Sequence, residues 1–280
     1  MKARVLFGVI GFAAVLLALY ALPPVVVYLA VAALCLLATY EVLASTKLVH
    51  NRLELLLCLL TSLGLAVGHF GMLPVSLSAV VQGLVFVLLI GSFAIELKFH
   101  SSMNVSQIAW GFFGALVVPY LMLSLLRIFQ MDIPFGLRDT GFRAGQFLIL
   151  LPLLAAWGAD TCALFAGMLF GKHKLAPVVS PKKTVEGAVG GIAGGAVLVL
   201  LASVLMNVML DMDIPVWTAI VLGGAGAVLG EIGDLSFSVI KRQTGIKDYG
   251  HIFPGHGGVL DRFDSVLFVA PFAEILLRIL

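Results

Sequence analysis

The sequence predicts an all-α, polytopic integral membrane protein with about nine transmembrane helices. Of its 280 residues, 61% are hydrophobic and 11% are charged, and the mean hydropathy is +1.13. A soluble globular protein could not bury that much apolar surface. A helix crosses ~30 Å of hydrocarbon with about 20 apolar residues and satisfies its own backbone hydrogen bonds there. Apolar runs of this length begin near Val5, Val25, Leu53, Ser78, Ile108, Gln146, Val185, Val216 and Ser265.

Only short polar loops separate these runs, so we expect a single transmembrane domain over residues 1–280. Its N-terminal helices occupy residues 1–145, and residues 146–280 hold the helices and cytosolic-side loops that carry the polar motifs. We interpret the run after Lys2 and Arg4 as a transmembrane helix rather than a signal peptide, because no small-x-small cleavage site precedes Pro23.

The distribution of Lys and Arg predicts a cytoplasmic N-terminus. The expected inner loops carry Lys47, Arg52, Lys98, Lys172, Lys174, Lys182, Lys183, Lys241, Arg242 and Lys247. The expected outer loops are poor in cations, except for Arg138 and Arg143, which Asp132 and Asp139 offset. The positive-inside rule therefore places the N-terminus and both cation-rich loops of the C-terminal half on the cytosolic face. We expect a multi-pass protein of the cell inner (cytoplasmic) membrane.

The segment Ser180 to Gly187 (SPKKTVEG) combines a predicted helix start with two lysines. Ser180 followed by proline is typical of an N-cap. Lys182 and Lys183 would oppose the helix dipole there unless an anion binds between them and the backbone N–H groups. The alternative is that both contact lipid headgroups. Glu186, one turn further on, could pair with either lysine.

Glycines recur at helical spacing in the two following spans, at Gly187, Gly190, Gly191, Gly194 and Gly195 and then at Gly223, Gly226, Gly230 and Gly233. This pattern predicts close helix packing more strongly than ligand contact. The packing could be within the chain or between two copies, so a homodimer is one possible arrangement.

The second of these spans carries a polar stripe of Glu231, Asp234, Ser238 and Lys241, spaced by three, four and three residues. Two acids on one stripe repel each other unless a cation lies near them, and a divalent metal is one solution. Asp160, inside an earlier apolar run, also needs a partner; it could face the bundle interior or bind a neighbouring helix end.

A glycine-rich segment follows the stripe. It contains Lys247, Asp248, His256, Gly257 and Gly258 and is followed by Asp261, Arg262 and Asp264. Glycines allow backbone N–H groups to approach phosphate oxygens. Carboxylates from Asp234 and from Asp261 or Asp264 suit Mg²⁺, which takes one or two carboxylates plus water and substrate phosphates.

Other chemistries lack their motifs. The sequence has no HExxH, CxxC, EF-hand, P-loop or GxSxG pattern. Metal-assisted phosphoryl or nucleotidyl transfer is therefore the favoured activity. The alternative is a cation-coupled transporter, which usually repeats its polar breaks in both halves, whereas here they lie in the C-terminal half. An alcohol transferase acting on a CDP-lipid would need a DGxxAR motif, which is missing.

The polar residues from Asp234 to Asp264 resemble, at matching spacing, the signature of the phosphatidate cytidylyltransferase (CDP-diacylglycerol synthase) family. SPKKTVEG resembles the family's SPKKTxEG motif, and Asp160 to Gly167 resembles its DxxAYxxG segment. The chain departs from the family at Leu164, Met168 and Glu231, where Tyr, a basic residue and Gln are usual.

The resemblance implies Mg²⁺-dependent conversion of CTP and phosphatidate to CDP-diacylglycerol and pyrophosphate at the cytoplasmic face, with residues 146–280 as the catalytic half. It implies Asp234 and Asp261 as metal ligands and leaves room for a second cation. The implied catalytic residues are Asp234, Asp261, Asp264, Lys241 and His256. The implied substrate-binding residues are Ser180, Lys182, Lys183, Glu186, Ser238, Arg242, Lys247, Asp248, Gly257, Gly258 and Arg262. It implies no nucleic-acid partner.

Overall fold

The computed structural model describes residues 2–71, 74–99, 105–133, 136, 141–252 and 257–279. Their chain is folded almost wholly into helices. The N-terminal helices are α1 (Lys2–Tyr20), α2 (Pro24–Tyr40), α3 (Arg52–Gly68), α4 (Leu77–Lys98), α5 (Val105–Phe112), α6 (Val118–Met122) and α7 (Ser124–Phe129). The C-terminal helices are α8 (Ala144–Leu148), α9 (Leu150–Leu153), α10 (Ala159–Phe170), α11 (Val185–Leu210), α12 (Val216–Gln243), α13 (Leu260–Phe263) and α14 (Val266–Leu277).

Six helical segments of the described chain are long and apolar enough to cross a membrane. They are Pro24–Ser45, Leu77–Lys98, Val105–Phe129, Ala144–Phe170, Val185–Leu210 and Val216–Gln243. Two shorter apolar helices, Ile10–Tyr20 and Val266–Leu277, accompany them. The prediction of a polytopic helical membrane protein is confirmed, and each of the predicted runs contains helix.

Three of the long segments contain a π-helical turn: η1 (Glu41–Ser45) continues α2, η3 (Phe113–Val117) joins α5 to α6, and η5 (Leu154–Gly158) joins α9 to α10. A π turn admits one extra residue into the helix, and such turns are frequent at functional sites. The sequence analysis predicted none of them, because an extra residue leaves an apolar run unchanged.

One small β-hairpin interrupts the helical fold. Strand β1 (Lys174–Ala176) pairs antiparallel with β2 (Ser180–Thr184), with Lys174 opposite Thr184 and Ala176 opposite Ser180. The all-α prediction missed this hairpin, which is too short to show a strand periodicity in the sequence. It lies directly before α11 and positions the two lysines of the SPKKT segment.

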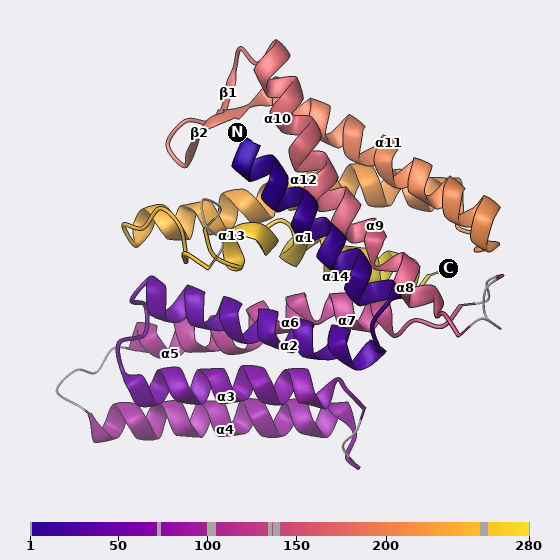
Figure 1. The fold of residues 1–280 in the computed structure, drawn as a ribbon. Helices are drawn as coiled ribbons and strands as arrows, with labels where there is room; N and C mark the ends of the chain where they lie inside the picture. Colours follow the sequence, from indigo (N-terminus) through magenta and orange to yellow (C-terminus); the bar gives the residue numbers. More distant parts are fainter. Residues whose placement is uncertain are drawn as a thin grey trace. The chain divides into compact units, whose positions relative to one another are not determined.

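The described chain forms two compact units. The first comprises Met1–Leu126 and Gln243–Arg262. Within it α3 packs along α2 and α4, and these long helices run side by side in Figure 1. Polar contacts join the helices: Thr39 Oγ1 donates to Gly114 O at 2.9 Å, and Ser92 Oγ donates to Glu54 Oε1 at 2.6 Å.

The second unit comprises Arg127–Arg242 and Phe263–Leu280. Its most extensive helix pair is α10 with α11, which lie against each other beyond the hairpin in Figure 1. α14 packs on α9 and η5. A buried ion pair joins α7 to α14, in which Arg127 Nε donates to Glu274 Oε2 at 2.7 Å.

Glycines allow the helices of the second unit to pack closely. A Cβ on Gly191 would meet Ala159 O and Ala163 Cβ of α10 at 3.0 Å, and a Cβ on Gly223 would lie 2.6 Å from Ala196 Cα of α11. A Cβ on Gly233 would lie 2.6 Å from Asp264 O. The predicted packing role of these glycine stripes is confirmed, and the contacts are within the chain.

Candidate functional site

The predicted site residues fall in both units. Those of the second unit are Ser180, Lys182, Lys183, Glu186, Asp234, Ser238, Lys241, Arg242 and Asp264. Those of the first unit are Lys247, Asp248, Gly257, Gly258, Asp261 and Arg262. His256 lies outside the described residues.

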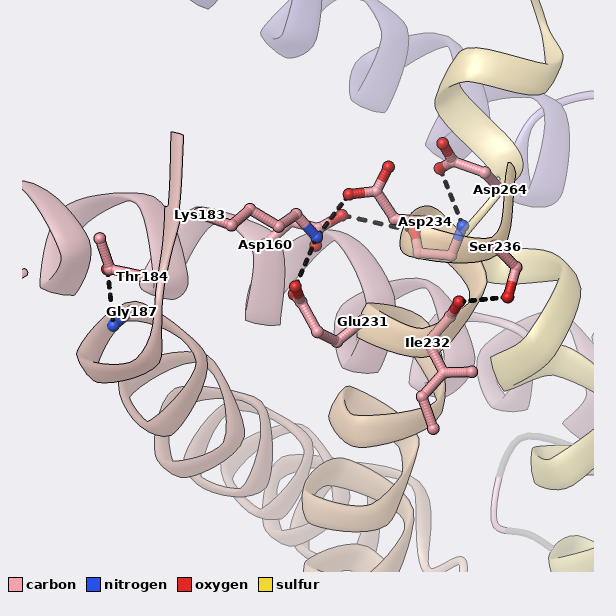
Figure 2. Close-up of polar contacts among 10 residues, drawn as sticks. Asp160, Lys183, Thr184, Gly187, Glu231, Ile232, Asp234, Ser236 and Asp264 are labelled. Atoms are coloured by element: carbon pink, nitrogen blue, oxygen red, sulfur yellow. Dashed lines mark hydrogen bonds and ion pairs between the residues drawn. The ribbon is translucent and has the colours of Figure 1, made fainter. Parts of the chain in front are cut away.

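The Lys183 cluster, defined here as Asp160, Lys183, Glu231, Asp234 and Asp264, is the centre of the second unit's polar residues. The Lys183 ammonium donates to Glu231 Oε1 at 2.7 Å and also contacts Asp234 Oδ2 (Figure 2). From the sequence, a divalent metal was one candidate for the cation that offsets the repulsion between Glu231 and Asp234 on α12. Lys183 is the cation that lies between them.

The hairpin explains why Lys183 and not Lys182 reaches these acids. Side chains alternate between the two faces of a strand. Lys182 is exposed, whereas the side chain of Lys183 is 22% exposed and lies over α12. The double-lysine motif therefore divides into one solvated cation and one paired cation.

The predicted helix start at Ser180 is wrong. Ser180 and Pro181 belong to β2, and α11 begins at Val185, with Thr184 as its N-cap. Thr184 Oγ1 accepts from Gly187 N at 3.1 Å, as Figure 2 shows. Ser180 matched the N-cap pattern, but its pairing with Ala176 extends the strand and moves the helix start four residues on. The lysines consequently lie on a strand, not on a first helical turn.

Lys183 is held in its charged form. Burial alone would lower the pKa of this ammonium, but the charges of Asp234 and Glu231, and their hydrogen bonds with Lys183, raise the pKa above its ordinary value. A permanent positive charge therefore lies between the SPKKT segment and α12.

Asp264 adds a second carboxyl beside Asp234. It follows α13, is 5% exposed and shares a hydrogen bond with Asp234. Burial and then the negative charge of Asp234 raise the pKa of Asp264 well above its ordinary value, while the charge of Lys241 opposes the rise. Asp264 Oδ1 also accepts from Ser265 N at 2.9 Å (Figure 2). The raised pKa favours a proton on Asp264 beside Asp234, at a place where a cation could replace the proton.

Asp160 lies at the edge of this cluster. It accepts from Ser265 Oγ at 3.4 Å and, together with Glu231, lines a pocket of about 270 Å³ among α10, α11 and α12. The other lining residues are apolar, among them Ile192, Val228 and Leu235. Asp160 thus lines this pocket and has a hydrogen-bond donor at the N-terminus of α14, which is the helix-end partner that the sequence offered as one of two alternatives.

Other predicted site residues of the second unit lie on α12, in the hairpin or at the start of α11. Ser238 and Lys241 are buried on α12, and Arg242 Nε donates to Val179 O in the hairpin loop at 3.2 Å. Glu186 pairs with neither lysine of the motif. Its carboxylate instead accepts from Lys172 N at 3.0 Å and from His173 Nδ1 at 2.6 Å, which fixes the segment entering the hairpin.

The Asp261 loop, defined here as the described residues 245–252 and 257–261, belongs to the first unit. Asp261 Oδ2 accepts from Tyr249 N at 2.7 Å and from Gly258 N at 2.9 Å. Gly257 has φ +85°, a left-handed conformation that favours glycine. The carboxylate thus closes a turn of its own loop.

Three of the predicted site residues of the first unit are charged and exposed: Lys247, Asp248 and Arg262. Lys247 and Asp248 lie within the Asp261 loop and Arg262 directly follows it, at solvent-accessible positions where a soluble anion could reach the two cations. The loop therefore presents charge outward while Asp261 itself is 8% exposed.

Sequence reasoning missed Glu41. Its carboxylate is 2% exposed and accepts from Val259 N at 2.9 Å and from Leu260 N at 2.7 Å, across 218 and 219 residues of sequence. One signal was present: a lone carboxylate at the end of an apolar run needs a partner, which is the argument made for Asp160.

Mg²⁺ fits the donor set in part. The Asp234 and Asp264 carboxyls provide hard oxygens that repel each other when both are ionised, which is the arrangement that a divalent cation stabilises. Among the described residues, no three His, Cys, Asp or Glu side chains are grouped closely enough to form a metal centre by themselves. A bound Mg²⁺ would thus complete its shell with water and phosphate oxygens.

Comparison with known proteins gives consistent matches. The profile of the cytidylyltransferase family matches residues 2–280. A phosphatidate cytidylyltransferase of Staphylococcus saprophyticus is 40% identical over 174 residues, which cover 58% of this chain and 65% of the relative. The proteins of the same name from Staphylococcus haemolyticus and Staphylococcus aureus are each 38% identical over the same lengths. The aligned part of the chain thus spans about 65% of the length of these curated relatives.

Proposed function

Because the chain belongs to the cytidylyltransferase family, we propose that it is a phosphatidate cytidylyltransferase. It would convert CTP and phosphatidate to CDP-diacylglycerol and pyrophosphate. The relatives named above carry this activity in their names, and the residues of the chain supply the charges that the reaction needs.

One observation supports the proposal most strongly: the SPKKT segment and the acidic stripe of α12 meet at Lys183. The contacts to Glu231 and Asp234 bring together two motifs that are 48 residues apart in sequence. Both motifs belong to the family signature, and a nucleotidyl transfer between two anions needs cations and carboxylates in one place. The transporter alternative does not account for this convergence.

In the proposed reaction, a phosphate oxygen of phosphatidate attacks the α-phosphorus of CTP. The new P–O bond forms as the bond to the β-phosphate breaks, and pyrophosphate leaves with the electron pair. No covalent enzyme intermediate is needed, since the attacking phosphate is already anionic at neutral pH. The protein has to hold two anions together and stabilise the charge that develops on the leaving group.

We assign the residues as follows. Lys182 and Arg242, exposed near the hairpin, and Lys247 and Arg262 of the first unit bind phosphates. Lys183 and Lys241 keep positive charge beside the carboxylates. Ser180, Glu186, Ser238 and Asp248 position these groups, and the backbone of Gly257 faces phosphate oxygens. The N–H of Gly258 holds the Asp261 carboxylate, and His256 orients a phosphate.

We propose Mg²⁺ as the cofactor, with Asp234 and Asp261 as ligands and Asp264 as a ligand or a hydrogen-bond partner of the ligands. When bound, the metal would neutralise phosphate charge and polarise the phosphorus–oxygen bond to the leaving group. The hydrogen bond between Asp264 and Asp234 supports this assignment in the second unit. A second cation is a further element of the proposal.

For the membrane arrangement, we propose nine spans, a cytoplasmic N-terminus and residence in the inner membrane, with the site at the cytoplasmic face. The cation-rich loops support this orientation. The glycine stripes give no support to a homodimer, because the contacts made by Gly191, Gly223 and Gly233 are within the chain.

The proposal is tested by incubating the purified protein in detergent with labelled CTP, phosphatidate and Mg²⁺. We expect labelled CDP-diacylglycerol and pyrophosphate in equal amounts, and no lipid product when EDTA removes the metal. A protein that forms no CDP-lipid under these conditions, but catalyses cation-dependent solute flux in liposomes, would be a transporter instead.

A further inference from the structure

The carboxylate of Glu41 is buried in a backbone cradle formed by a distant part of the chain. Glu41 begins the π turn η1, and both of its oxygens are used: Oε1 accepts from Val259 N at 2.9 Å and Oε2 accepts from Leu260 N at 2.7 Å. All of these residues belong to the first unit. A bidentate carboxylate on two successive backbone N–H groups fixes the orientation of the peptide that joins them.

The cradle is shaped closely around this carboxylate. A Cβ built on Gly258 would lie 2.2 Å from Glu41 Oε1, and a Cβ built on Gly250 would lie 2.5 Å from the same atom. A Cβ at either position would therefore displace the Glu41 carboxylate. The sequence predicted only phosphate contact for Gly258. The backbone of the loop thus lies in contact with the Glu41 carboxylate at both Gly250 and Gly258.

Asp261 accepts hydrogen bonds from the backbone of the same loop. Its Oδ2 accepts from Gly258 N and Tyr249 N, so that Gly258 donates to Asp261 while the next two residues donate to Glu41. Of the three consecutive N–H groups from Gly258 to Leu260, the first thus donates to Asp261 and the next two donate to Glu41. The position of the Asp261 side chain depends on this backbone, and the backbone depends on Glu41.

We propose that Glu41 is a positioning residue for the reaction, holding the Asp261 loop so that the Asp261 carboxylate keeps its catalytic orientation. The inference rests on the proposed function for its catalytic part, while the contact between Glu41 and the loop is independent of it. Glu41 acts through Asp261 and contacts neither substrate nor metal in this proposal.

The decisive variant is Glu41→Gln, which keeps the side-chain volume but leaves one of the two N–H groups facing an amide NH₂ instead of an acceptor. Loss of a hydrogen bond to a charged acceptor predicts a roughly tenfold or larger increase in amide exchange for the segment that depends on it. Hydrogen exchange measured by mass spectrometry, on metal-free protein, should show this increase in peptides covering residues 249–261 and little change in α3 and α4.

Glu54→Gln is the matched control. Glu54 is also a fully buried carboxylate of the first unit, but it accepts from Ser92 Oγ of α4 rather than from the backbone of the loop. It should leave exchange of residues 249–261 as in the wild type. Glu41→Asp keeps the charge on a shorter side chain and should give an exchange rate between those of wild type and Glu41→Gln.

Turnover separates positioning from simple structural support. With Glu41→Gln we expect kcat to fall at least tenfold and the Mg²⁺ concentration for half-maximal rate to rise, with partial recovery in Glu41→Asp and the KM for CTP within about twofold of wild type. Unchanged exchange of residues 249–261 in Glu41→Gln would overturn the proposal, as would wild-type kcat and Mg²⁺ dependence in a variant whose loop exchanges faster.

If Glu41→Gln does not fold, Gly258→Ala and Glu41→Asp carry the same test, since an alanine Cβ would push the carboxylate out of its cradle without removing its charge. Exchange in either variant that matches Glu54→Gln would equally overturn the inference. A wild-type protein without CDP-lipid synthesis would refute the proposed function alone, because the exchange measurement needs no substrate.

Discussion

The Lys183 ammonium lies between Glu231 and Asp234, 2.7 Å from Glu231 Oε1 and in contact with Asp234 Oδ2. This relationship joins the strand that precedes α11 to the middle of α12. It gives an acidic stripe a fixed positive partner and leaves the neighbouring Lys182 exposed. The hairpin therefore supplies the positive charge of this cluster, and α12 supplies the two carboxylates beside it.

Replacing Lys183 by methionine should abolish CDP-lipid synthesis, by at least a hundredfold in kcat/KM. The variant leaves Glu231 and Asp234 partly buried without their cation, so we also expect a loss of about 1–3 kcal/mol in unfolding free energy, less than for a fully buried pair. Turnover with labelled CTP and thermal unfolding in detergent measure the two effects.

Lys174→Met provides the control for that variant, because Lys174 is an exposed lysine of the same hairpin outside the cluster. It should retain near wild-type turnover. Lys183→Met with activity equal to that of Lys174→Met would remove Lys183 from the proposed site.

Adjacent glycines of α12 should respond in opposite ways to alanine. A Cβ on Gly223 would lie 2.6 Å from the Ala196 Cα atom and 2.4 Å from Gly195 O, whereas a Cβ on Gly224 meets only Ala196 Cβ at 4.0 Å. Gly223→Ala should lower the midpoint temperature of unfolding, because overpacking costs about 1–3 kcal/mol. Gly224→Ala should leave it unchanged or raise it, since alanine favours helix by about 0.5–1 kcal/mol. Equal midpoints for the two variants would contradict the packing described here.

The N-cap of α11 gives a third prediction. Thr184→Ala removes the acceptor for Gly187 N and should cost about 1 kcal/mol of stability. Thr184→Ser keeps the hydroxyl and should recover most of that loss. Chemical or thermal unfolding of the three proteins makes the comparison, and a serine variant no more stable than the alanine variant would exclude capping as the cause.

Magnesium binding should be linked to proton release. The raised pKa of Asp264 means that this carboxyl holds a proton at pH values where an exposed aspartate is ionised. The proton competes with the metal, so Mg²⁺ affinity should increase as the pH rises and level off once Asp264 is ionised. Titration calorimetry in two buffers of different ionisation enthalpy measures the released proton.

The matched variant for this experiment is Asp264→Asn, which cannot ionise. Its Mg²⁺ affinity should be lower at high pH and should no longer vary with pH through the range in which the wild type does. A wild-type affinity that is independent of pH would show that Asp264 is not near the bound metal.

Much of this architecture follows from the sequence because membrane insertion demands long apolar runs. The spans, the polar stripe of α12 and the packing role of glycines such as Gly191 and Gly223 depend on periodicity and composition, which are local properties. The positions of Asp234 and Lys241 on one helix face follow for the same reason.

The partners of these residues did not follow, because they depend on contacts between distant segments. Ser180 satisfied the N-cap pattern, but strand pairing moved the cap to Thr184. Lys183 was expected to bind an anion or Glu186, and it pairs with acids of α12 instead. Whether a carboxylate meets a lysine, a metal or a backbone amide is a tertiary property that spacing alone does not determine.

The bidentate contact of Glu41 also bears on how the protein could be divided. The N-terminal helices contain none of the signature residues, and a shortened protein starting at residue 127 would keep every one of them. It would nevertheless lack the carboxylate that fills the space between Gly250 and Gly258. The first 126 residues therefore supply the Glu41 carboxylate that holds a loop more than two hundred residues further along the chain. Co-expressing the two fragments is consequently a more promising route to an active split protein than expressing the second fragment alone.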